Sequence, residues 1–217
     1  MKHFSIAFLM AIISITSIAQ QNAMKHGMDT NYTLPIGIPV HTLAPRINTT
    51  TVSGKKLDTD NLLKSGPVVV LFYRGEWCPV CNKYLSELNE SLPEINKTGA
   101  TVLVISPELV ENAKKTKEET KSDFIFISDT SLQILRDYDV IFDVNEKYQN
   151  KIKKFLHTDI AQNNGQEKAK LPVPATYIIN KQGVIIYKQF DYDYKNRASA
   201  EDILKALHNS TLLKKTL

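Results

Sequence analysis

Continuous apolar stretches alternate with amphipathic stretches along most of this chain. Apolar runs occur at 67–73 (PVVVLFY), 100–106 (ATVLVIS) and 124–128 (FIFIS), and each indicates a strand buried on both faces. After the first run, apolar residues recur at helical spacing over 80–92, and a charged helix is expected from about 107 to 121. Strands that alternate with helices predict an α/β protein.

Turn and capping residues fix the remaining elements. The sequence TVSGKKLD predicts a hairpin, followed by a short helix that Asp58 or Asp60 caps and Gly66 ends. Pro93 should kink or end the helix that follows the first apolar run. A helix around 146–156, a hairpin over 175–190 and a closing helix capped by Ser199 complete a central mixed sheet flanked by helices.

The 217 residues are enough for one domain with a sizeable core. Residues 1–19 resemble a secretory signal peptide, with basic Lys2, an apolar run and small Ala19 before a polar break. Residues 20–33 read as a flexible lead, and 34–217 as the domain. We therefore expect a protein that is exported to the periplasm or secreted, with no membrane contact after signal removal. The alternative is a retained anchor.

Charge and metal-binding residues add little to this picture. The formal net charge is +4, and the lysine-rich patches are interleaved with acidic or apolar residues, so nucleic-acid binding is not predicted. Met24, His26 and Met28 alternate in a pattern that suits a soft metal such as Cu(I), but three ligands on a mobile tail lack supporting groups. The sequence predicts neither a cofactor nor a metal.

The chain's two cysteines, Cys78 and Cys81, open a helix directly after the first apolar run. Unpaired backbone N–H groups and the positive end of the helix dipole stabilise a thiolate there. Two sulfurs on one turn can also close a disulfide, so a redox dithiol is the leading interpretation. An inert disulfide and a zinc site are the alternatives; zinc requires about four ligands.

Two motifs carry a family resemblance. WCPVC, from Trp77, resembles the Trp-Cys-x-x-Cys of thioredoxins, and PATYIIN resembles the strand entry of thioredoxin-fold reductases. Most of 34–187 is similar to peroxiredoxins of the alkyl hydroperoxide reductase and thiol-specific antioxidant family. The resemblance implies a thioredoxin-like fold, in which Pro174 is a cis-proline beside the cysteines and Trp77, Pro174 and Thr176 shape the site.

The same resemblance assigns roles to the cysteines and shows two departures. The family's peroxidatic cysteine falls on Cys81, its threonine on Cys78 and its proline on Arg74. Arg74 either supplies positive charge near the thiolate or lies on the surface at a strand end. By analogy with thioredoxins Cys78 is the attacking cysteine, whereas by analogy with peroxiredoxins it is Cys81.

The resemblance implies a thiol-dependent oxidoreductase, most simply one that reduces hydroperoxides. A thioredoxin-like protein or a small thiol would be its reductant, and a homodimer its assembly. The alternatives are disulfide exchange on proteins and a non-catalytic binding protein with a structural disulfide. The loop FDYDYKNRA, which contains Asp191 and Arg197, receives no role; we expect it to pack a tyrosine against the final helix.

Overall fold

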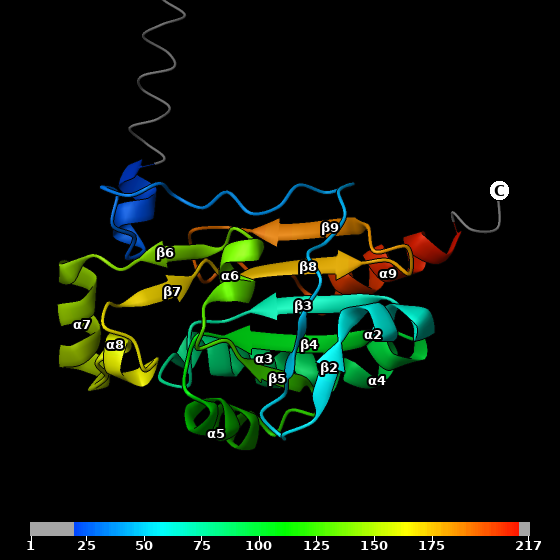
Figure 1. Ribbon diagram of the computed structural model, residues 1–217, viewed down its shortest axis with the longest axis horizontal. Helices are drawn as coiled ribbons and strands as arrows, with labels where there is room; N and C mark the ends of the chain where they lie inside the picture. The colour runs from blue at the N-terminus through cyan, green and yellow to red at the C-terminus, as the bar shows by residue number, and fades with distance from the viewer. Residues whose placement is uncertain (1–19, 213–217) are drawn as a thin grey trace, which may run out of the picture.

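A five-stranded mixed sheet lies at the centre of the structure, with its strands in the order β5-β4-β3-β8-β9 (Figure 1). The computed structural model describes residues 20–212. β3, β4 and β5 are parallel, whereas β8 and β9 are antiparallel to their neighbours. The mixed sheet predicted from the sequence is confirmed. Its strands are β3 (Val68–Phe72), β4 (Thr101–Ser106), β5 (Ile125–Ser128), β8 (Ala175–Ile179) and β9 (Ile185–Phe190).

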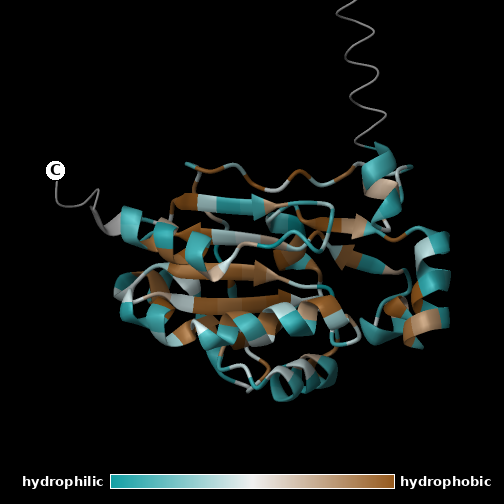
Figure 2. Cartoon of the chain, turned by 180° about the vertical axis from the view of Figure 1, so that it is seen from behind, coloured by the Kyte–Doolittle hydropathy of each residue, from teal (hydrophilic) through white to brown (hydrophobic). Residues whose placement is uncertain are grey.

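Helices cover both faces of this sheet. One face packs against α3, α4, α5 and α9 through side chains such as Leu85, Ile95 and Ile203, and the other packs against α2 and α6 through Leu62 and Leu135. Figure 2 shows the inner strands as mostly hydrophobic and the outer helices with alternating polar and apolar residues. The helices are α2 (Thr59–Ser65), α3 (Pro79–Glu90), α4 (Leu92–Lys97), α5 (Val110–Thr120), α6 (Gln133–Asp137) and α9 (Ala200–Leu212).

The start of α3 positions the dithiol. Cys78 is the N-cap residue, and Pro79 occupies the first helical position, where its missing N–H costs no hydrogen bond. The helix ends at Glu90, and α4 begins after Ser91 with Pro93 in its first turn. The predicted interruption near Pro93 is therefore confirmed.

Two small sheets flank the central one. The predicted hairpin is formed by β1 (Asn48–Thr50) and β2 (Lys56–Asp58). A pair that the sequence did not predict, β6 and β7, lies at one end of the central sheet beside α7 and α8 (Figure 1). Its two strands lie at the two ends of the segment 141–172, so they pair residues that are about 30 positions apart. The bounds are β6 (Ile141–Asp143), β7 (Lys170–Pro172), α7 (Glu146–Leu156) and α8 (Ile160–Asn163).

The segment 20–33 differs from the expected flexible lead. Residues 20–25 are helical, and Met28 forms an isolated bridge with Val144. Ala23 and Met28 are almost fully buried and His26 is largely so, because packing these side chains removes apolar surface from water. The expected signal peptide at 1–19 lies outside the described residues. Among the described helices, none is long and apolar enough to span a bilayer.

The next part of the chain runs along the edge of β9 (Figure 1). His41 N–H donates to the Ile185 carbonyl at 2.7 Å, and Ile185 N–H donates to the Thr42 carbonyl at 2.9 Å. At the opposite edge, Val52 N–H donates to the Phe126 carbonyl of β5 at 3.0 Å. Both outer strands are thus partly covered, which reduces their tendency to pair with other chains.

Candidate active site

Cys78 and Cys81 form a disulfide at the carboxyl end of the central strand β3. Their Cα atoms are 5.2 Å apart, and the residues are 1% and 0% exposed. The Cys78 Sγ accepts a hydrogen bond from the Cys81 N–H at 3.3 Å. This contact is the side-chain cap of α3, so the same N–H would stabilise a Cys78 thiolate once the bridge is reduced.

Each sulfur contacts a different guanidinium, and Arg197 is half-buried whereas Arg74 is buried. Arg74 Nη2 lies 3.4 Å from the Cys78 Sγ, and Arg197 Nη2 lies 3.4 Å from the Cys81 Sγ. Arg74 is only 3% exposed, which rules out the alternative of a surface arginine at a strand end. Burial lowers the pKa of Arg197 to about 10; the neighbouring Tyr84 opposes this shift and Arg74 adds to it. The charge of Arg197 is therefore present at neutral pH.

Aromatic rings surround the Arg74 guanidinium. Its Cζ lies 3.6 Å from the ring centre of Tyr194, 5.3 Å from that of Trp77 and 5.7 Å from that of Tyr148. Arg74 NH1 also donates to the Tyr148 hydroxyl. Burial raises the pKa of Tyr148, although the charge of Arg74 opposes this. Cation–π contacts hold the guanidinium in place without neutralising it.

Neither guanidinium has an acidic partner among the described residues. The ion pairs there involve only His26, lysines and Arg46. A buried charge without a counter-ion is unfavourable, and in the disulfide form the sulfurs provide none. Reduction produces a thiol that can ionise beside each guanidinium. The arrangement therefore favours the reduced, ionised state of the dithiol.

A buried carboxylate supports the loop between β3 and α3. Glu108 is 0% exposed, and its Oε1 accepts hydrogen bonds from the Tyr73 hydroxyl and from Ser106 Oγ at 3.1 Å. Its Oε2 accepts from the Glu76 N–H at 2.8 Å. Burial raises the pKa of Glu108, and these hydrogen bonds oppose the rise. Glu108 thus fixes the backbone two residues before Cys78.

Glycine is required at one position of this loop. Gly75 has a φ of +149°, and a Cβ there would lie 2.6 Å from Trp77 Nε1. Trp77 is 6% exposed and packs against Arg74, so it forms a wall of the site as expected for a site-shaping residue. The resemblance that named Trp77 thus selected a residue that contacts the charged side chain beside Cys78.

The structure places the other two site-shaping residues at the start of β8. Pro174 is buried, but no cis peptide bond occurs among the described residues, so the predicted cis-proline is wrong here. Val173 N–H is held by the Val140 carbonyl at 2.7 Å, and the chain continues extended into β8 with the more stable trans isomer. Thr176 is buried near Tyr84, whose hydroxyl donates to the Ala198 carbonyl at 2.9 Å and whose ring lies 5.2 Å from the Arg197 Cζ.

The loop after β9 was assigned no role from sequence, yet it supplies two residues of the site. Tyr194 stacks on Arg74, and Arg197 contacts Cys81, whereas Tyr192 packs against the hydrophobic cluster to which α9 contributes Ile203. Arg197 Nε also donates to the Tyr194 carbonyl at 2.7 Å, which ties the two residues together. The sequence offered one signal: an arginine and tyrosines clustered directly after the last strand.

The described residues contain no group of three or more His, Cys, Asp or Glu side chains suited to a metal. Of the alternating Met24, His26 and Met28, Met24 is 53% exposed and the other two are buried. His26 instead lies 3.7 Å from Asp193 and makes an edge contact with Tyr194. It therefore supports the loop that carries Arg197.

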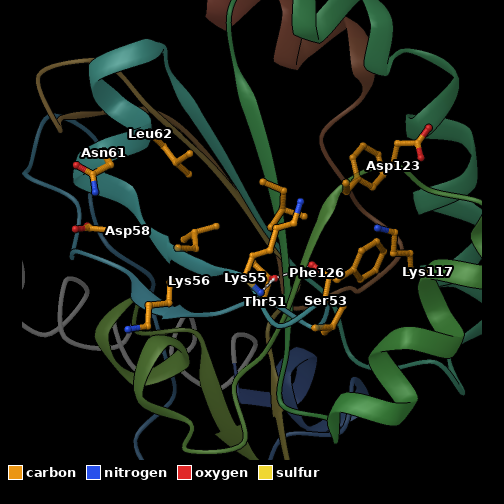
Figure 3. Close-up of a pocket in the computed structure, with 14 residues that line it drawn as sticks. Thr51, Ser53, Lys55, Lys56, Asp58, Asn61, Leu62, Lys117, Asp123 and Phe126 are labelled. Carbon is orange, nitrogen blue, oxygen red and sulfur yellow. Dashed lines mark hydrogen bonds between the residues drawn. The ribbon is translucent and has the colours of Figure 1, made fainter.

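A cavity of about 390 Å³ lies between the β1–β2 hairpin and β5 (Figure 3). Lys55, Lys56 and Lys117 border it together with Asp58 and Asp123, so its charges are mixed. None of the residues that contact the two sulfurs line it. The candidate active site is therefore the buried dithiol with its two arginines.

The chain is similar to known proteins in sequence and in fold. The sequence model of the AhpC/TSA family matches residues 40–188. The chloroplastic peroxiredoxin Q of Oryza sativa subsp. japonica is 27% identical over 124 residues, which cover 57% of this chain and 46% of that protein. The chain thus spans about half the length of this relative.

Two further proteins extend the comparison. The thiol-disulfide oxidoreductase ResA of Bacillus cereus is 23% identical over 145 residues, which cover 67% of this chain and 66% of that protein. The solved structure of peroxidoxin BcpB from Mycobacterium tuberculosis has a TM-score of 0.59 at 18% identity, over 82% of this chain and 98% of that chain. The predicted thioredoxin-like fold, a mixed sheet flanked by helices, is confirmed.

Proposed function

The chain belongs to the AhpC/TSA family, and from this premise we propose that it reduces hydroperoxides at the expense of thiols, through the Cys78–Cys81 pair. One observation carries the proposal: each sulfur has its own guanidinium at 3.4 Å, that of buried Arg74 or that of half-buried Arg197, and neither guanidinium has a carboxylate partner among the described residues. Such a site stabilises thiolates, which are the nucleophiles in this chemistry.

The reaction has two steps at the protein. The Cys81 thiolate attacks one peroxide oxygen, the O–O bond breaks, and the leaving alkoxide takes a proton to become an alcohol. Cys81 is then a sulfenic acid. The Cys78 thiol attacks that sulfur, the S–O bond breaks and water leaves, which gives the disulfide. Two electrons have passed from the two sulfurs to the peroxide.

Two buried donors can hold the peroxide. Arg74 Nε and Trp77 Nε1 have no hydrogen-bond partner among the described residues, although both are buried. Arg74 contacts Cys78 with another nitrogen of the same guanidinium. A donor that is rigidly held beside the sulfurs stabilises negative charge on the departing oxygen. In the family pattern a proline stands at the position of Arg74 and a threonine at the position of Cys78.

An external thiol must close the cycle. A thioredoxin-like dithiol or a small thiol would attack the disulfide, leave as its own disulfide and return both cysteines to the reduced state. Because both sulfurs are buried, some of the side chains around them must move aside for this step. We also propose that the protein acts after export and as a homodimer. Mass spectrometry of the purified protein and its sedimentation would test these two points.

Disulfide exchange on protein substrates is the second candidate. Cys78 Sγ accepts from two donors, Arg74 and the Cys81 N–H, whereas Cys81 Sγ accepts from Arg197. This favours Cys78 as the more acidic thiol, which is the arrangement that exchange through Cys78 requires.

Stopped-flow mixing of the reduced protein with hydrogen peroxide and with an organic hydroperoxide distinguishes the two candidates. The wild type, Cys78→Ser and Cys81→Ser proteins would be compared. We expect rapid thiol loss that persists in Cys78→Ser and disappears in Cys81→Ser. Rates equal to those of free cysteine in all three, with rapid reduction of insulin disulfides by the wild type, would replace the proposal with disulfide exchange.

A further inference from the structure

A second cavity lies where the segment 21–31 crosses the first half of α7, and the proposed reaction does not use it. Its volume is about 630 Å³, within the range of ligand-binding pockets. Met24 and Met28 from the segment and Tyr148 from α7 line it. It is therefore a gap between two parts of the chain that are far apart in sequence.

The lining has an apolar part. Met24 is 53% exposed, whereas Met28 and Tyr148 are buried at 1% and 7%. Gly27 lies directly on the Tyr148 ring, where an added Cβ would come within 2.7 Å of the ring carbon Cγ. The ring is thus fixed, while the flexible thioethers can adapt to a ligand.

The lining also has a positive part. Lys25, Lys147 and Lys151 border the cavity, and none of them makes an ion pair among the described residues. Lys147 and Lys151 are four residues apart on α7, where like charges repel and destabilise the helix. The acidic residue of the lining, Asp29, uses Oδ1 to accept from the Asn31 N–H at 3.0 Å.

We propose that this cavity binds a single-chain amphipathic anion of the fatty-acid type. The alkyl chain would lie against Met24, Met28 and Tyr148, and the carboxylate would lie among the three amines. An inorganic anion would leave the methionines unused, and a neutral lipid would leave the lysines unpaired. Only a ligand with both parts satisfies the whole lining.

The cavity is one side chain away from the redox site. Tyr148 forms part of its wall, and the Tyr148 hydroxyl accepts a hydrogen bond from Arg74, which contacts Cys78. Ligand binding does not depend on the proposed peroxidase reaction, so it can be tested on the disulfide form of the protein in the absence of peroxide.

Isothermal titration calorimetry with decanoate, below its micelle concentration, is the direct test. Decanol, decyltrimethylammonium and acetate serve as probes that each lack one required feature. We expect decanoate to bind at least tenfold more tightly than any of the three. Equal affinity for decyltrimethylammonium, or no binding of decanoate at millimolar concentration, would overturn the proposal.

A matched pair of variants locates the binding. Lys147→Gln/Lys151→Gln should weaken decanoate binding at least tenfold. Lys153→Gln/Lys154→Gln removes the same charge from the same helix outside the cavity, and should leave the affinity unchanged. All four positions are exposed, so both proteins should fold, which circular dichroism would verify. Equal weakening in both variants would mean non-specific attraction to the basic helix and would refute the assigned site.

Discussion

Removing the charge of Arg74 tests the central electrostatic argument. In Arg74→Gln the guanidinium that lies 3.4 Å from the Cys78 Sγ is replaced by a neutral amide. An opposite charge this close stabilises an ionised group by roughly 1–3 pKa units, or about 1.4–4 kcal/mol. For a two-electron couple this equals about 30–90 mV in the midpoint potential of the disulfide. Because the charge stabilises the reduced form, the variant should have the more negative potential.

The size of this difference in midpoint potential should depend on pH. At low pH the reduced Cys78 is a neutral thiol in both proteins, so removing the charge of Arg74 has little effect on the midpoint potential. As the pH rises past the ionisation of the wild-type thiol, only the wild type gains the thiolate stabilisation. The difference between the two potentials should therefore be small near pH 5 and approach its full value near pH 9, above the ordinary thiol pKa of about 8.5.

Redox titration in dithiothreitol buffers, with the thiols counted by mass spectrometry, measures the midpoint potential and its pH dependence. Arg74→Lys keeps the charge and should recover most of the shift at high pH. Arg46→Gln removes a charge from an exposed arginine that pairs with Asp58, and should leave the potential unchanged. A difference that is the same near pH 5 and near pH 9, or the absence of any difference, would refute the reasoning.

Three further predictions concern stability, each measured by urea unfolding. Burial raises the pKa of Glu108 in the folded protein above its value in the unfolded chain. The stabilising contribution of Glu108 is therefore complete below the unfolded pKa and is lost as the pH rises through the folded pKa. Between about pH 5 and about pH 8 the wild type should lose more stability than Glu108→Gln, and equal losses would contradict this. Leu103→Ala, at a fully buried site in β4, should cost about 2–5 kcal/mol, whereas Leu43→Ala, at a residue that is 74% exposed, should change the stability by less than about 0.5 kcal/mol. Asp58→Ala removes the cap that accepts from the Asp60 N–H together with the ion pair to Arg46, and should cost about 0.5–2 kcal/mol; an unchanged stability would show that both interactions are dispensable.

The elements that could be predicted are those whose cause is local. The three adjacent valines of 68–70 indicated a central buried strand, and β3 occupies that position. The helix expected around 146–156 has those bounds in α7, because Asn145 caps it with its own side chain. The dithiol at the start of α3 was likewise predictable, since Pro79 and the cap at Cys78 are adjacent in sequence.

The elements that were missed depend on contacts between distant segments. β6 and β7 are three residues each, and they pair across the whole stretch of 144–169. Strands this short have no periodicity to detect, and their pairing is decided by the tertiary structure. The segment 20–33 appeared flexible for the same reason. Its few apolar residues become buried only because α7 is already in place beside them.

The two arginines show why only part of a site of this kind can be predicted from a sequence. Arg74 lies four residues before Cys78, so the sequence suggested, as one of two alternatives, that it supplies positive charge near the thiolate. Arg197 lies 116 residues after Cys81, and it reaches the sulfur because β9 ends at the same edge of the sheet at which α3 begins. A single positive charge beside two sulfurs would favour one thiolate and leave the other thiol neutral. With one guanidinium for each sulfur, the identity of the attacking cysteine is not decided by charge alone. It then depends also on which sulfur the incoming substrate can reach, and Arg197, from the loop after β9, contacts the Cys81 sulfur directly.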